Sequence, residues 1–317
     1  MHYYVASERV PCQRVVDELW DYAEAFDDSA MKAVAATARG VNLHAGGHYV
    51  ESSIWLEKAL SLYDPARGKS QASLIGMDCR VWSKALLSQC VFNFGHISRG
   101  IALGQEAIDW AREIRHTPSL ALAILYLSQI WQMCGDKEQV RQHTDELLQT
   151  AKTYGLPAFE GYGATVAAWV GDNSAAVQGI IAVLRQLNCN LVLTYYGSFV
   201  ADIEAEAGRI PAAIAQVDHW LATCEQNQEF FFDAELWRRR GLYELRLPQP
   251  QHETARDALK RACVLARERG IHRVEASAIQ DLLQSFPEDQ ELAPRLAQLL
   301  SAYPELSQLP RPIRALS

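Results

Sequence analysis

Residues 33–65 read AVAATARGVNLHAGGHYVESSIWLEKALSLYDP, in which two helical patterns flank a glycine break. The small and apolar residues of the first pattern are Ala36, Gly40 and Leu43, and those of the second are Ser52, Leu56 and Ala59. They recur three or four positions apart, which is typical of one face of a helix. Gly46 and Gly47 separate the patterns, and Asp64-Pro65 ends the second. The segment therefore predicts two antiparallel helices joined by a tight turn.

This hairpin resembles a tetratricopeptide (TPR) repeat, whose pattern is W-x2-L-G-x2-Y, then A-x3-F, then P. Similar units recur along the chain, about 36 to 48 residues apart, against ~34 in a TPR array. Their turn glycines are Gly47, Gly95, Gly135, Gly171 and Gly208. A glycine inside a helix costs about 1 kcal/mol relative to alanine, so Gly40 and Gly241 are predicted to be sites of close helix packing. No strand-like alternation of useful length appears. The predicted fold is all-α, a TPR-like right-handed superhelix of antiparallel helix pairs.

The repeats divide the chain into four predicted parts. Residues 1–28 form a partial repeat or capping helix, 29–270 an array of about six helical hairpins, 271–303 a degenerate capping repeat, and 304–317 a Pro-rich tail. Tyr3-Tyr4-Val5 is interpreted as the end of a first helix whose partner follows at 11–26. The chain is therefore expected to be a fragment of a longer protein. A native N-terminus with a capping helix is the alternative.

Charge and cysteine content narrow the class of protein. The 317 residues carry a formal net charge of -8, which argues against nucleic acid as the ligand, because phosphate binding needs clustered Lys and Arg. Seven scattered cysteines without C-x2-C spacing predict reduced, buried thiols. The start lacks a signal-peptide pattern, and no apolar stretch approaches the ~20 residues of a membrane span. We expect a cytoplasmic protein without membrane contact.

No set of residues specifies a reaction, so we predict that the chain is not an enzyme and holds no cofactor or metal. Gly68-Lys69-Ser70 matches only the end of a phosphate-binding loop, because Tyr63 stands where the first glycine belongs. It is interpreted as a linker between units. His44 and His48 are four residues apart, but the glycines between them end the helix and no third ligand is near. Both are predicted to be turn histidines rather than metal ligands.

Candidate partner contacts come from the first helix of each unit, because these helices line the concave face of such arrays. Arg238 and Arg239 are candidates for binding an anion or an acidic peptide, and a solvated helix face with at most one residue turned inward is the alternative. Tyr195 and Tyr196 are candidates for a ligand wall, with core packing as the alternative. Asn93, at the end of a first helix, completes the set.

Residues 232–241, FDAELWRRRG, resemble the AELYRLKGE stretch of a group of bacterial multidomain regulators, and so do Tyr63-Asp64-Pro65 and HTPSLA at 116–121. In that group a C-terminal TPR region follows a signalling ATPase domain, with a nucleotide-cyclase, winged-helix or LuxR-type DNA-binding domain at the N-terminus. The resemblance implies a non-catalytic regulatory module of signal transduction or transcription. Such a module binds a protein, peptide or effector on its concave face, and the neighbouring ATPase domain is one candidate partner. The alternative is a stand-alone peptide-sensing TPR receptor, which Asn42 and Asn93 favour and the lack of further asparagines on first helices disfavours.

Overall fold

The computed structural model describes residues 2–67, 72 and 75–309, and every regular element within them is helical. The elements, in chain order, are α1 (His2–Val5), α2 (Arg9–Ala25), α3 (Ser29–Ala45), α4 (Tyr49–Leu62), α6 (Cys79–Asn93), α7 (Ile97–Glu113), α8 (Thr117–Met133), α9 (Lys137–Tyr154), α10 (Pro157–Val170), α11 (Ser174–Gln186), α12 (Leu193–Glu206), α13 (Ile210–Asn227), α14 (Asp233–Leu245), α15 (His252–Glu268), α16 (His272–Ser285), η1 (Gln290–Leu292), α17 (Ala293–Ala302) and η2 (Pro304–Gln308). The linker motif at 68–70 and residues 310–317 lie outside the described part. The all-α prediction is confirmed.

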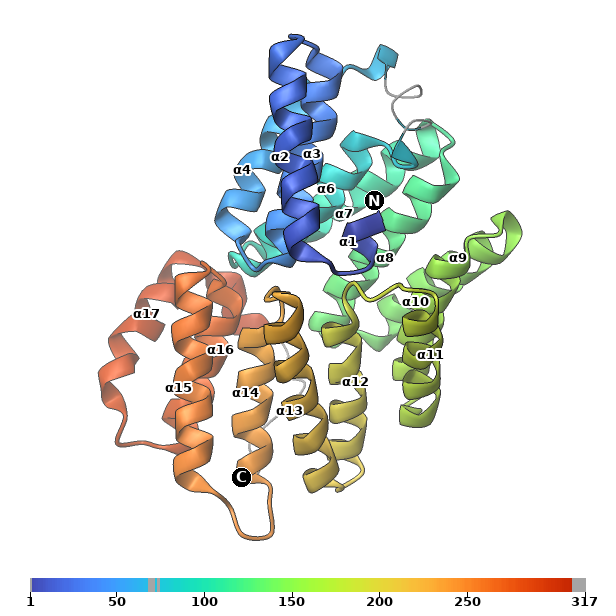
Figure 1. Ribbon diagram of the computed structural model, residues 1–317. Coiled ribbons are helices and arrows are strands. Elements are labelled where there is room, and N and C mark those ends of the chain that lie inside the picture. The colour runs from blue at the N-terminus through green and yellow to red at the C-terminus, as the bar shows by residue number, and fades with distance from the viewer. Residues whose placement is uncertain (1, 68–71, 73–74, 310–317) are drawn as a thin grey trace.

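Consecutive helices pack against each other along the chain, as Figure 1 shows. First helices of neighbouring units also touch, α3 against α6 and α6 against α8. A single hairpin cannot bury its own apolar face, so this stacking supplies a continuous core. The arrangement is a TPR-like α-solenoid. None of the helices in the described ranges is long and apolar enough to cross a membrane.

The turns within the hairpins use left-handed residues, as the glycine positions predicted. Gly47, Gly95, Gly135 and Gly208 all have positive φ, between +74° and +100°. The fourth unit differs, because Gly171 ends α10 with φ at -86° and Asp172 takes the left-handed position with φ at +52°. An Asp tolerates this conformation better than most residues, so the turn keeps its shape without a glycine there.

Glycines inside the helices mark close contacts between the two helices of a unit. A Cβ atom at Gly40 would lie 2.7 Å from Leu56 Cδ2, and one at Gly241 would lie 2.7 Å from Leu259 Cγ. Both distances are too short for carbon atoms in contact. The predicted packing role of these two glycines is confirmed.

The array curls until its C-terminal units touch its first units, at a contact that we call the seam. There, Phe230 N donates to Ala45 O at 3.1 Å, and Tyr49 Oη donates to Phe231 O at 2.7 Å. A second contact of the seam lies between α7 and η2, where Ser98 N donates to Glu305 Oε2 at 2.9 Å. The start of the predicted Pro-rich tail is therefore a helical part of the seam. The two ends of the array are therefore joined by contacts within the chain.

Candidate functional site

The five side chains predicted to touch a partner all lie inside the molecule. Arg238, Arg239, Tyr195, Tyr196 and Asn93 are each 3% exposed or less. In this structure none of the five presents a free surface to a partner. Their role as partner contacts stays a prediction, and their interactions within the chain are described next.

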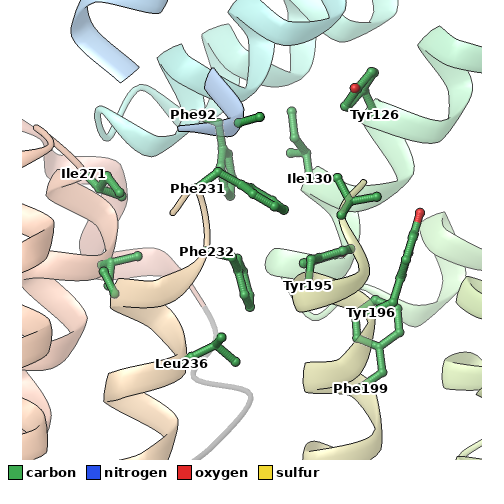
Figure 2. Close-up of a cluster of buried hydrophobic side chains, with 14 of the residues drawn as sticks. Phe92, Tyr126, Ile130, Tyr195, Tyr196, Phe199, Phe231, Phe232, Leu236 and Ile271 are labelled. Carbon is green, nitrogen blue, oxygen red and sulfur yellow. The ribbon is translucent and has the colours of Figure 1, made fainter. Parts of the chain in front are cut away.

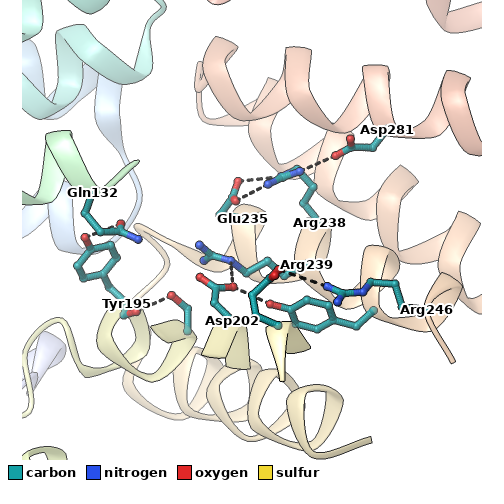
Figure 3. Close-up of polar contacts among 11 residues, drawn as sticks. Gln132, Tyr195, Asp202, Glu235, Arg238, Arg239, Arg246 and Asp281 are labelled. Carbon is teal, nitrogen blue, oxygen red and sulfur yellow. Dashed lines mark hydrogen bonds and ion pairs between the residues drawn. The ribbon is translucent and has the colours of Figure 1, made fainter. Parts of the chain in front are cut away.

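Arg238 and Arg239 take part in buried ion pairs, shown in Figure 3. Arg238 lies 2.9 Å from Glu235 Oε1 and 2.5 Å from Asp281 Oδ2, measured from its two terminal nitrogens. Arg239 Nε lies 3.0 Å from Asp202 Oδ1. The solvated-face alternative is therefore wrong for both arginines. Their carboxylate partners come from three helices, α12, α14 and α16, so the pairs join three first helices of the last units.

Charge compensation decides the protonation of this cluster. Burial raises the pKa of the Glu235 carboxyl, but the charges of Arg238 and Arg239 outweigh it and hold that pKa at about 2. Glu235 is consequently ionised near neutral pH. For the Asp202 carboxyl, burial outweighs the charge of Arg239. The pKa of Asp202 is therefore raised.

Tyr195 and Tyr196 sit in an aromatic cluster where α12 meets α8 and the start of α14, as Figure 2 shows. Tyr195 Oη donates to Gln132 Oε1 at 2.8 Å. Gln129 Nε2 donates to Tyr196 Oη at 3.3 Å, and the Tyr196 ring stacks on Tyr162. Every polar atom of the two phenols has a partner within the chain, which fits the core-packing alternative.

The asparagines at the ends of first helices also bind within the chain. Asn93 Oδ1 accepts from Arg273 Nε at 3.1 Å across the seam, and its amide nitrogen donates to Gln89 O. Asn42 accepts from Arg9 and donates to Gln13, both on α2. Both side chains are buried, and Asn42 lies in the wall of an open polar hollow of about 600 Å³ beside α2.

The histidines and cysteines show no arrangement for metal binding. His44 lies in the last turn of α3 and His48 caps α4, so they bracket the turn as predicted. Burial lowers the pKa of His44 to about 3, with the charge of Arg9 adding to the effect. All seven cysteines are buried and free. Among the described residues, no group of three or more His, Cys, Asp or Glu side chains could hold a metal ion.

The sequence did not reveal the position of the first residues, which lie on the inner wall of the first four units. The Tyr4 ring packs edge-on against Trp82 of α6, with ring centroids 5.8 Å apart. Its hydroxyl lies 3.5 Å from that of Tyr126 on α8. Val5 O accepts from Asn190 N and Leu191 N, both at 2.9 Å. The chain thus places its own N-terminal segment, His2–Val5, in the middle of the array.

A buried carboxyl group ties this segment to the rest of the molecule. Glu229 accepts from Ser7 Oγ at 2.6 Å and from Thr194 Oγ1 at 2.7 Å. Burial raises the pKa of the Glu229 carboxyl, and the two hydroxyl donors oppose that rise without cancelling it. Ser7 has φ at +60°, which turns the chain between α1 and α2.

Two apolar pockets flank the contact between Tyr4 and Trp82. One, of about 320 Å³, lies between α1, α2, α3 and α6, and includes Cys12, Val34 and Val41 in its wall. The other, of about 260 Å³, lies between α1, α8 and α10, and includes Leu122 and Phe159. By contrast, the space among Glu235, Arg238 and Arg273 amounts to about 30 Å³. The inner wall of the first units therefore has room for a ligand, and that of the last units does not.

Comparison with known proteins gives similarity without an assigned activity. No family model matches the chain. An uncharacterized protein of Rhizobium meliloti (strain 1021) is 23% identical over 232 residues, which are 71% of this chain and 22% of that protein. The chain thus spans about a fifth of the length of the curated relative that it matches.

Proposed function

We propose that the chain is a non-catalytic interaction module of a bacterial signal-transduction or transcription regulator. It acts in the cytoplasm and binds a protein or peptide segment, or an effector, on the inner wall of its first four units. The observation that carries this proposal is that the same wall already binds a short segment of the chain, His2–Val5.

The contacts of this segment are of the kind that recognise peptides. The wall binds a side chain, because Tyr4 lies against Trp82 and Tyr126. It also binds the backbone, because Val5 O accepts from two amide nitrogens and Ala6 O accepts from Asn190 Nδ2 at 3.2 Å. Backbone bonds supply affinity and side-chain sockets supply specificity in peptide-binding grooves. A partner segment with an aromatic residue fits the same chemistry.

The architecture and the relative's length agree with a module in a larger regulator. Solenoids expose long curved surfaces that suit partner binding. The matching protein is several times longer than the matched segment, which leaves room in that protein for further domains. An ATPase domain of the same protein is the partner that we propose first.

A peptide added in trans tests the proposal. Tyr4→Ala in the full chain removes the ring that occupies the socket, so a fluorescent copy of residues 2–8, HYYVASE, should gain access to it. Fluorescence anisotropy should show saturable binding at least about tenfold tighter than to the unaltered chain, whose own segment competes. Tyr22→Ala is the matched control, because Tyr22 lies exposed on α2.

The specificity of binding is checked with a peptide in which the tyrosine matching Tyr4 is replaced by alanine. That peptide should not bind. If the HYYVASE peptide binds neither protein saturably, or binds Tyr22→Ala as well as Tyr4→Ala, the inner wall is not a peptide site.

A further inference from the structure

The two pockets beside Tyr4 have a common wall, since Tyr4, Trp82 and Ile75 line both. The first pocket holds about 320 Å³ and the second about 260 Å³. An apolar cavity of ~150 Å³ is enough to bind benzene. Each pocket therefore has room for a ligand larger than a single ring.

The chemistry of the walls restricts the class of ligand. Among the described residues that line the two pockets, none is Asp, Glu, Lys, Arg or His. The polar groups of the side chains are the hydroxyls of Thr37 and four tyrosines, the Cys12 thiol, the Gln129 amide and the Trp82 indole N–H. A charged ligand would lose its hydration without gaining a counter-charge, which costs several kcal/mol. An uncharged apolar molecule has no such cost.

We propose that these pockets bind an uncharged, mainly apolar small molecule, such as an aromatic compound of one or two rings or a medium-length alkyl chain. This inference deepens the proposed function by naming the class of effector, and it rests on that function only for the regulatory consequence. Binding itself depends on the two pockets alone.

The regulatory consequence follows from the position of Tyr4. A molecule in either pocket contacts Tyr4 and favours the conformation in which His2–Val5 is docked. That segment is hydrogen-bonded through Val5 to Leu191, and the following Ser7 is bonded to Glu229 near the seam. Ligand binding therefore stabilises the closed array relative to one whose ends have separated, because a ligand shifts an equilibrium by its difference in affinity.

A neutral dye tests for the site in the full chain. N-phenyl-1-naphthylamine should bind saturably with a rise in fluorescence, and it should raise the thermal unfolding temperature. Ala38→Phe and Ala158→Phe each add a ring to the wall of one pocket. Either change should weaken dye binding by about tenfold or remove one of two binding steps. Ala175→Phe, on the exposed face of α11, is the matched control and should leave binding unchanged.

A second measurement uses the unaltered chain and so does not depend on the variants folding. A neutral alkyl diazirine, activated by light, should label peptides that contain residues 3–5, 75–82 and 122–129. The inference is overturned if the dye does not bind saturably, if both pocket variants bind as the control does, or if labelling falls only on exposed Tyr22 and Phe26. Dye binding without binding of the HYYVASE peptide would refute the proposed peptide function and leave the ligand site standing. Binding of the HYYVASE peptide without binding of the dye would refute the ligand site and leave the proposed peptide function standing.

Discussion

The inner wall between α3 and α10 and the inner wall between α12 and α16 are built from first helices of the same repeat type. The first contains two apolar pockets around Tyr4 and Trp82. The second is filled by Glu235, Arg238 and Asp281, with little space left over. The difference teaches that a position on the concave side does not by itself make a residue a partner contact. In the last units paired charged residues fill the inner wall and join the helices, and in the first units apolar pockets remain.

The largest expected effect comes from breaking the ion pairs of the last units. Arg238→Ala removes the cation that pairs with both Glu235 and Asp281 in the buried cluster. Unfolding by urea should show a loss of about 3–5 kcal/mol, as for other buried pairs that lose one partner. Arg141→Ala is the control, because Arg141 and its partner Glu138 are exposed, and it should cost less than about 1 kcal/mol. A similar small loss for Arg238→Ala would show that the cluster is not a structural joint.

Close helix packing should matter equally in both regions. Gly40→Leu in the first units and Gly241→Leu in the last units each force a side chain into a space already held by Leu56 or Leu259. Overpacking of this kind costs about 1–3 kcal/mol or more, so both variants should lose part of the array in thermal unfolding. Gly179→Leu is the control, because no atom lies within 4 Å of a Cβ placed there. Unchanged unfolding temperatures in Gly40→Leu and Gly241→Leu would refute the assigned helix register.

Two buried glutamates should give opposite pH dependence. The folded pKa of Glu235 is lowered from 4.5 to about 2. Its ionised carboxylate therefore adds to the free energy of unfolding above pH 4.5, and this stabilisation is lost as the pH falls towards 2. The folded pKa of Glu229 is raised above 4.5. Its protonated carboxyl therefore adds fully to the free energy of unfolding below pH 4.5, and this stabilisation is lost as the pH rises through the raised pKa. Urea unfolding across pH should show that Glu235→Gln removes the acid-side loss and Glu229→Gln removes the loss on raising the pH. The same pH trend from both variants would contradict the two environments.

The smallest expected effect concerns the N-terminal segment. Ser7→Ala removes the hydroxyl that donates to Glu229 at 2.6 Å and should cost about 0.5–1.5 kcal/mol. Hydrogen exchange should become faster at the amides of Asn190 and Leu191, which donate to Val5. Ser61→Ala, which removes only an exposed bond to Lys58 O, should leave that exchange unchanged. Equal exchange in both variants would show that Ser7 does not help to dock the segment.

Local signals predicted the fold well because a helical hairpin is largely a local structure. The turn glycines and the packing positions Gly40 and Gly241 lie where the sequence indicated. Gly171 shows the limit of such a signal, since the next residue, Asp172, takes the left-handed conformation instead. In such a turn either of two neighbouring residues can take the left-handed conformation.

The candidate site was harder to predict because its contacts join distant parts of the chain. Tyr4 meets Tyr126, 122 residues away, and Ser7 meets Glu229, 222 residues away. No repeat pattern encodes such pairs. The apolar run Tyr3-Tyr4-Val5 precedes the first full helix and was a signal that could have pointed to burial. Arg238 was predicted to lie on the concave side. Its ion-pair partner Asp281 lies 43 residues later, in the next unit, where no local pattern indicates the pairing.

Xenon offers the most direct test of the difference between the two inner walls, because it enters dry apolar cavities and avoids polar, filled ones. A crystal of the full chain under xenon gas should show xenon on both sides of the Tyr4–Trp82 contact and none among Glu235, Arg238 and Arg273. Ordered water in place of xenon beside Tyr4, or xenon among the arginines alone, would contradict the assignment of the first units as the binding wall.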